Sequence, residues 1–192
     1  MALQFPRSKT LLVIFLFVIG FPAGRSSDSG YTVTAEITVE NRTPNPLIKP
    51  YLRISKGVNL SNPVDIRYNS KGTFTVRKPA IHAEGTFGTV SWIATKHQRR
   101  FVVMWSVPFD LNLYSNWMGL GMTMKGKWQA RTDLFKKMYN EDSNGILTHV
   151  RKEFCKDTRP VNLMLDGFNI TGTMTCSNHA KINVLFQLTN KN

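Results

Sequence analysis

The stretch "YTVTAEITVEN", from Tyr31 to Asn41, decides the fold class of this chain. Apolar and polar residues alternate along it without a break, which places one set on each face of an extended strand. The apolar face holds Tyr31, Val33, Ala35, Ile37 and Val39, whereas the other face holds only threonine and glutamate. A strand of this composition is half-buried, with one face on a hydrophobic core and one in water.

Further short strands are predicted along the rest of the chain, separated by glycine, proline and polar residues. Val90–Thr95 and Arg100–Val107 are the arms of a hairpin, and Lys96-His97-Gln98-Arg99 is its turn. The other predicted strands are residues 51–55, 64–68, 72–77, 117–125, 149–154, 161–165 and 180–188. Only Trp128–Glu141 changes to a helical period, with apolar residues at i, i+4 and i+8. About ten short strands and one helix predict an all-β fold, a compact β-sandwich with one flanking α-helix.

The first 26 residues differ in character from the remainder of the 192-residue chain. The apolar run Leu11–Phe21 follows Arg7 and Lys9 and precedes small residues, which is the pattern of a secretory signal peptide. A membrane span needs roughly 20 apolar residues, so a retained anchor is the weaker alternative. We therefore expect a secreted protein with a signal peptide at residues 1–26 and one domain at residues 27–192.

Charge and cysteine content indicate the surroundings in which this domain works and the kinds of surface that it contacts. Without Arg7, Lys9 and Arg25 the net charge falls from +13 to +10, with 22 basic and 12 acidic residues. A secreted basic protein meets membrane surfaces or acidic glycans rather than nucleic acid. Cys155 and Cys176 form either a disulfide, which suits a secreted protein, or two buried thiols.

The sequence contains none of the motifs that carry catalysis or bind cofactors. No nucleophile elbow, HExxH, phosphate-binding loop or paired-cysteine zinc spacing occurs, and the four histidines are scattered. The sequence therefore predicts a protein that is not an enzyme and that carries neither a metal nor a cofactor.

A loop rich in large apolar side chains is the strongest functional signal. In "SVPFDLNLYSNW", Ser106–Trp117, proline, aspartate and asparagine interrupt any strand or helix. The apolar residues are Phe109, Leu111, Leu113, Tyr114 and Trp117. Phe109, Tyr114 and Trp117 could fold back to cap the end of the sandwich, or the apolar side chains could remain exposed as a binding surface. Because tryptophan and tyrosine favour membrane interfaces, the second alternative predicts a lipid partner.

The same segment resembles the signature S-V-P-Y-D-Y-N-W-Y-S-N-W of the actinoporins, the pore-forming cytolysins of sea anemones. The identical positions are Ser106, Val107, Pro108, Asp110, Asn112, Tyr114, Ser115, Asn116 and Trp117. Weaker similarity extends over most of the chain. Tyr51-Leu52-Arg53 resembles a family Y-F-R, and Lys125-Gly126-Lys127 resembles a family K-G-K that precedes the helix.

The resemblance implies a β-sandwich that binds phosphocholine headgroups, with sphingomyelin preferred, and that assembles as a homo-oligomer on the target cell membrane. The phosphocholine-binding residues that carry over are Arg53, Ser55, Phe87, Ser106, Pro108, Tyr114, Trp117, Phe135 and Tyr139. Aromatic faces would hold the quaternary ammonium, and Arg53 would pair with the phosphate. The residues expected in the membrane interface are Phe109, Leu111, Leu113 and Trp117. Lys96, Arg99, Arg100, Lys125 and Lys127 would attract an anionic surface if they share a face.

Several positions depart from the family pattern. Leu113 replaces a family tryptophan, and Asn140 replaces a family tyrosine. The family makes its pore with a long amphipathic helix before the first strand, whereas a cut near Ser26 leaves only about five residues before that strand. Two alternatives stay open: the leader is retained and inserts, or the protein binds membranes without perforating them. A glycan-binding module on the same sandwich, as in fungal fruit-body lectins, is the remaining interpretation.

Overall fold

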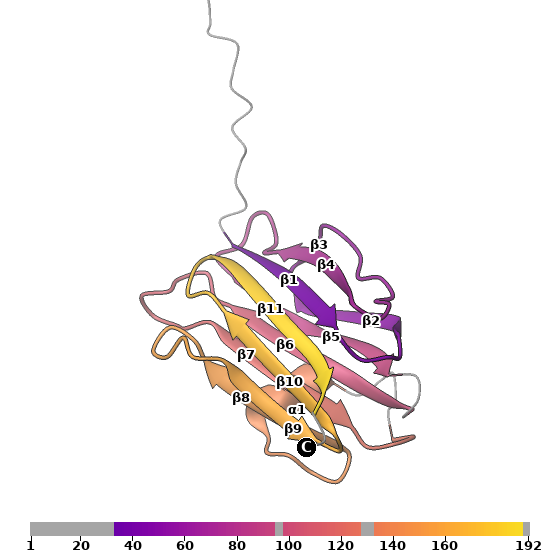
Figure 1. Ribbon diagram of the computed structural model, residues 1–192. Coiled ribbons are helices and arrows are strands. Elements are labelled where there is room, and N and C mark those ends of the chain that lie inside the picture. The colour runs from indigo at the N-terminus through magenta and orange to yellow at the C-terminus, as the bar shows by residue number, and fades with distance from the viewer. Residues whose placement is uncertain (1–32, 95–97, 128–132, 190–192) are drawn as a thin grey trace, which may run out of the picture. The chain divides into compact units, whose positions relative to one another are not determined.

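The computed structural model describes residues 33–94, 98–127 and 133–189, which form two stacked β-sheets and one helix (Figure 1). The predicted signal peptide and the turn residues Lys96 and His97 lie outside these ranges. No helix among the described residues is long and apolar enough to cross a membrane.

One sheet has six strands and contains the stretch that decides the fold class. Its order is β3 (Val58–Asn59), β4 (Ser70–Arg77), β1 (Thr34–Asn41), β11 (His179–Leu188), β10 (Phe168–Met174) and β9 (Val161–Leu165). β1 pairs with β11 in parallel, and the other neighbours are antiparallel. Ala35, Ile37 and Val39 are fully buried, which confirms the alternation predicted for β1.

The second sheet has five strands and lies behind the first in Figure 1. Its order is β2 (Leu47–Lys56), β5 (Thr86–Ala94), β6 (Arg99–Val107), β7 (Trp117–Thr123) and β8 (Leu147–Glu153). Aromatic side chains of both sheets meet between the layers, where the Phe101 and Phe186 rings stack with centroids 4.8 Å apart. The predicted β5–β6 hairpin is confirmed by its antiparallel register.

One predicted strand is absent from the structure, and two strands, β3 and β10, were not predicted. Residues 64–68 form no strand, because only Ile66 pairs, in an isolated bridge with Leu47. The Ile66 side chain is nevertheless buried. Conversely, β10 was missed because Gly172 interrupts its apolar alternation. A Cβ at Gly172 would lie 2.2 Å from Cε of Met118, so a larger residue there would force the end of the Met118 side chain to move.

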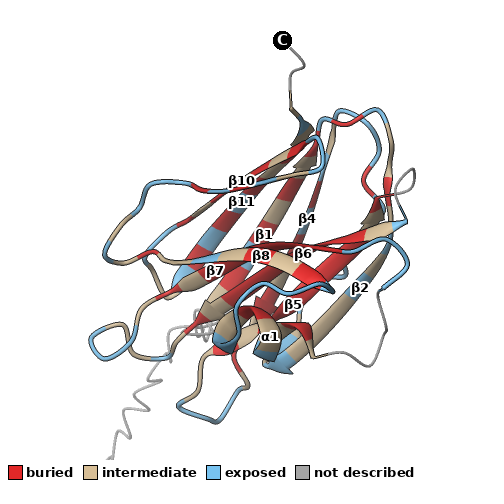
Figure 2. Ribbon diagram, turned by 90° about the horizontal axis from the view of Figure 1, so that it is seen from below, coloured by how far each residue is buried: buried red, intermediate tan, exposed pale blue. Residues whose placement is uncertain are grey.

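The helix α1 (Leu134–Asn140) lies on the outer face of the five-stranded sheet, which makes it a third layer in Figure 2. It is shorter than the predicted Trp128–Glu141, because Asp133 is its N-cap and accepts a hydrogen bond from the Lys136 amide. Residues 128–132 lie outside the described ranges. Leu134 and Met138 are buried against the sheet, and that packing stabilises a helix too short to persist alone.

Two glycines of β7 allow the helix to lie this close. A Cβ at Gly119 or Gly121 would each lie 3.1 Å from Cε of Met138, which is tighter than an ordinary van der Waals contact. Both glycines lie within β7, inside the strand predicted at residues 117–125. Their function in the fold is to seat α1 on the sheet.

Candidate functional site

A pocket of about 590 Å³ opens at one end of the five-stranded sheet, beside the aromatic loop. Six of the predicted phosphocholine-binding residues line it: Phe87, Ser106, Pro108, Tyr114, Trp117 and Tyr139. Phe109 and Leu113, which were predicted for the membrane interface, line it as well. The structure therefore brings together most of the residues that the sequence assigned to one site.

Strand register explains why these residues converge. Lys56, Phe87, Ser106 and Trp117 are successive register partners on β2, β5, β6 and β7, so they form one row across four strands. Antiparallel partners place their side chains on the same face of the sheet, about 5 Å apart. The row supplies the floor of the pocket, and the loop and the helix supply its walls.

Four aromatic rings from three elements form a continuous wall. The Phe87 and Phe135 centroids are 4.9 Å apart, and the Phe135 and Tyr139 rings stack at 5.4 Å. Trp117 meets Tyr139 edge to face at 5.7 Å. Phe135 itself does not line the cavity but supports the rings that do. Ring faces arranged in this way present negative electrostatic potential to a bound cation.

The aromatic loop keeps its apolar side chains in water instead of folding back over the sandwich. Leu113 is 72% exposed and Tyr114 is 67% exposed, while Leu111 is only partly buried. Asp110 satisfies the loop backbone locally, because its carboxylate accepts from the Asn112 amide and its carbonyl accepts from the Tyr114 amide. The capping alternative is therefore wrong for these side chains.

Asn116 anchors the end of the loop to the rest of the sandwich. Its side-chain amide is buried and donates to the Thr175 and Ser177 carbonyls, at 2.8 and 2.9 Å. Cys176 lies between those two residues and forms a disulfide with Cys155, so the thiol alternative is wrong. The disulfide thus reinforces the turn on which the aromatic loop rests.

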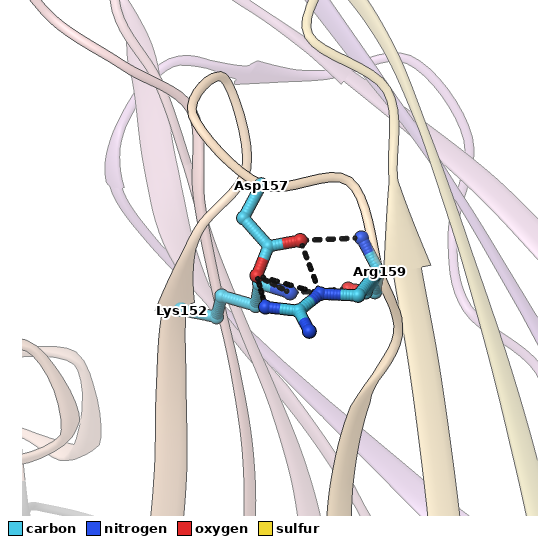
Figure 3. Close-up of polar contacts among 3 residues, drawn as sticks. All are labelled: Lys152, Asp157 and Arg159. Carbon is cyan, nitrogen blue, oxygen red and sulfur yellow. Dashed lines mark hydrogen bonds and ion pairs between the residues drawn. The ribbon is translucent and has the colours of Figure 1, made fainter.

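The segment that carries Cys155 is held by a cluster of charged groups (Figure 3). The Asp157 carboxylate accepts hydrogen bonds from the Arg159 side chain and amide and forms an ion pair with Lys152 at 2.9 Å. These contacts, those with Arg159 above all, hold the pKa of Asp157 well below its usual range. The cluster is exposed, so it shapes the segment rather than adding greatly to global stability.

Side chains of β8 fix the end of α1 and with it the Tyr139 ring. The Glu141 carbonyl, which follows the helix, contacts Nε2 of His149 at 3.1 Å and accepts from Arg151 at 2.6 Å. Burial lowers the pKa of His149, so its ring favours the neutral form. Arg151 also donates to the Met138 carbonyl, and together these contacts satisfy carbonyl groups at the helix end.

Two predicted residues lie away from the pocket. Arg53 pairs with Thr89 further along β2 and does not line the cavity. Ser55 lies where the β2–β5 register shifts between Ile54 and Lys56, and it does not line the cavity either. Such an irregularity changes which residue of a strand faces a given site, and the sequence pattern gave no sign of it.

An ion pair at the pocket was missed by the sequence analysis. Lys56 and Glu84 both line the cavity, and Nζ of Lys56 lies 3.1 Å from the Glu84 carboxylate. Lys56 occupies the place expected for Arg53 as the cation beside the pocket. The sequence alone gave little reason to select Lys56, because a lysine next to a glycine in a polar stretch is an ordinary pattern. Its place at the pocket depends on the strand register.

The predicted basic surface is not one patch. Arg100 is buried, donates to Ser91 and to the Lys49 carbonyl, and has its pKa lowered to about 10 by that burial. Arg99 forms an ion pair with Asp166. Only Lys125 and Lys127 are exposed among the predicted cations that the structure describes.

Neither the described residues nor the known relatives point to catalysis. No group of histidine, cysteine or acidic side chains able to hold a metal occurs within residues 33–94, 98–127 and 133–189. The family reported next is described as a cytotoxic protein, a description that names no enzymatic activity.

Comparison with known proteins gives consistent matches. A family model described as "Sea anemone cytotoxic protein" matches residues 50–187. Tereporin-Ca1 of Terebra anilis is 43% identical, over 85% of this chain and 89% of the tereporin. Conoporin-Cn1 of Conus consors is 33% identical, over all of this chain and 90% of the conoporin. The solved structure of the lipid binding protein Nakanori covers 82% of this chain and 72% of its own, with a TM-score of 0.65 at 13% identity, which supports the fold alone.

Proposed function

This chain belongs to the sea anemone cytotoxic protein family, the actinoporin-type pore-forming cytolysins, and on that premise we propose that it is secreted and docks on phosphocholine lipids of a target cell membrane through the aromatic pocket. Sphingomyelin is the proposed preferred lipid. The observation that carries the proposal is the pocket itself, in which aromatic rings and one ion pair surround a cavity of about 590 Å³ beside an exposed apolar loop.

The chemistry of the pocket matches a zwitterionic headgroup. A quaternary ammonium offers no hydrogen-bond donor, so ring faces bind it best, and Tyr114, Trp117 and Tyr139 provide them. Each ring contributes about 0.5–2 kcal/mol, depending on how completely water is excluded. Lys56 would contact the phosphate, and its neighbour Glu84 would favour a headgroup that also carries a positive charge.

The exposed side chains around the pocket would enter the interface of the bilayer. Leu113 and Phe109 extend from the same loop that lines the cavity, and both are exposed. A bound headgroup therefore brings apolar side chains to the boundary between headgroups and acyl chains, where aromatic and aliphatic groups are stabilised. The net charge, +10 without the signal peptide, adds attraction to any anionic lipid.

Pore formation is proposed as a second step, because docking on headgroups alone leaves the bilayer intact. If the leader is retained, its apolar run Leu11–Phe21 is the segment that such a step would insert. Comparing dye release by protein that starts at Met1 with protein that starts at Ser27 tests this assignment. Dye release by both forms would mean that another segment inserts. Dye release by neither form would mean that the protein docks on membranes without perforating them.

The test of docking is sedimentation with vesicles that contain or lack sphingomyelin. Replacing Tyr139 by alanine should weaken binding roughly two- to thirtyfold, as expected for the loss of one ring. Tyr68→Ala is the matched control, because Tyr68 is an exposed tyrosine that does not line the pocket. Phosphocholine in solution should compete with the vesicles. Equal binding by both variants, or competition by a sugar in place of phosphocholine, would contradict the proposal.

A further inference from the structure

We propose that the loop between β4 and β5, residues 78–85, is a second membrane contact whose apex, Ile81, enters the lipid. The inference rests on the proposed docking function and adds a surface that neither the loop signature nor the family resemblance pointed to. The partner is a lipid bilayer, contacted at the boundary between headgroups and acyl chains.

Ile81 is 92% exposed, the highest value among the large apolar side chains of the described residues. A single exposed apolar residue is common on soluble proteins and by itself indicates little. The position of this one is informative, because Ala83, Glu84 and Gly85 of the same loop line the pocket beside Pro108 and Phe109. Ile81 therefore projects from the rim of the candidate site.

A buried lysine gives this loop its shape. Lys78 is only 8% exposed, and its Nζ donates to the Pro79 carbonyl at 3.3 Å and to the His82 carbonyl at 2.7 Å. A lysine is rarely buried unless its ammonium finds such acceptors. The two carbonyls lie on either side of Ile81, so the ammonium closes a turn with the isoleucine at its apex.

The same ammonium joins the two loops. Nζ of Lys78 lies 5.3 Å from the centroid of the Phe109 ring, within the range of a cation–π contact. The backbone of Phe109 is held separately, because its carbonyl accepts from the Asn178 side chain at 2.9 Å. Ile81 and the aromatic loop are thus parts of one unit and would meet a surface together.

A bilayer fits this arrangement because Ile81, Phe109, Leu113 and Tyr114 are exposed on two adjoining loops around the headgroup pocket. If a headgroup fills the pocket, both loops face the same lipid layer. Each apolar side chain that then leaves water adds to the partitioning free energy in proportion to its buried area.

The experiment compares Ile81→Ser with wild type in the full chain, using vesicles of sphingomyelin and phosphatidylcholine. We expect the partition coefficient to fall about tenfold, as for the transfer of one large aliphatic side chain out of lipid. The affinity for phosphocholine in solution should be unchanged, because Ile81 does not line the pocket. This second measurement separates membrane anchoring from headgroup recognition.

Met164→Ser is the matched control. Met164 is 70% exposed on the edge strand β9, and its register partner Asn169 pairs with Gln187 near the end of β11. The aromatic loop contacts Asn178, before the start of β11, so Met164 lies at the opposite end of the sheet. Its replacement should leave partitioning at the wild-type value.

The possible outcomes distinguish a failure of the Ile81 inference from a failure of the proposed function. Wild-type partitioning by Ile81→Ser, with competition by phosphocholine intact, would overturn this inference and leave the proposed function standing. An equal loss in both serine variants would also overturn it, since the effect would not depend on the loop. Failure of the wild-type protein to bind any vesicle would remove the proposed function and this inference together.

Discussion

Gly85 offers the sharpest test of how the pocket is built. An ideal Cβ at this position would lie 2.0 Å from the Val107 carbonyl oxygen and 2.8 Å from Cα of Pro108. Carbon and oxygen ordinarily approach to about 3.3 Å. Both neighbours are backbone atoms that cannot rotate away, so Gly85→Ala must push the start of β5 and the end of β6 apart by about 1 Å.

The cost follows from that displacement. Overpacking of a well-packed site destabilises by about 1–3 kcal/mol, and a clash with backbone on two residues belongs at the upper end of this range. For a domain of this size, each kcal/mol lowers the melting temperature by about 2–4 °C. We therefore expect Gly85→Ala to melt about 6–12 °C below wild type.

The assay is thermal unfolding followed by circular dichroism, together with vesicle sedimentation at 20 °C. Because Val107 and Pro108 line the pocket, binding should fall even where the variant is fully folded. Gly145→Ala is the control, since a Cβ there would meet no atom within 4 Å. A melting temperature of Gly85→Ala equal to that of Gly145→Ala would refute the contact on which the reasoning depends.

Three further predictions concern the groups that support the site. Reducing the Cys155–Cys176 disulfide should lower the free energy of unfolding by about 3 kcal/mol, measured by urea denaturation with and without reductant, because it closes a loop across 21 positions. Acidification from pH 7.5 to 5.5 should destabilise the protein. Burial lowers the pKa of His149 in the folded protein. In the unfolded chain the same imidazole takes up a proton below its ordinary pKa of about 6.5, so acid favours the unfolded state. Melting temperatures across this range, compared with those of His149→Gln, measure the effect, and identical pH profiles would contradict it. Arg100→Gln should cost about 2–4 kcal/mol of stability through its lost buried hydrogen bonds. The same variant should leave vesicle binding of the folded protein unchanged. Weakened binding would mean that Arg100 belongs to the basic surface predicted from the sequence.

The fold class was accessible from the sequence because alternation is a local property. β1 was predicted from a period-two pattern that the structure retains, and the β5–β6 hairpin was predicted from two apolar runs that flank a polar turn. β10 was missed, and its Gly172 lies against Met118 of the other sheet, a contact that no local pattern reports. The helix was placed correctly, and Asp133 is its N-cap, so the described helix begins at Leu134.

The aromatic residues of the site were also accessible, because the loop motif and the helix pattern are each contained in one short segment. The charged partners were not. Lys56 reaches the pocket only because the register shifts within β2, and Glu84 meets it across 28 positions of sequence. Arg53 and Ser55 were assigned to the site on sequence similarity, but neither lines the pocket. The register shift displaces Ser55, whereas Arg53 pairs with Thr89 before the shift and lies further along β2.

By itself, the sequence determined most of the strands and the ring chemistry of the site, because periodicity and composition act over a few neighbouring residues. It left open whether the loop residues are exposed. The tertiary structure alone decided which cation faces the pocket, that Arg100 is buried, and that Lys78 joins the Ile81 loop to Phe109. The physical reason is that these contacts depend on strand register and on the approach of segments distant in sequence. Both are set by the packing of two whole sheets and not by any single segment.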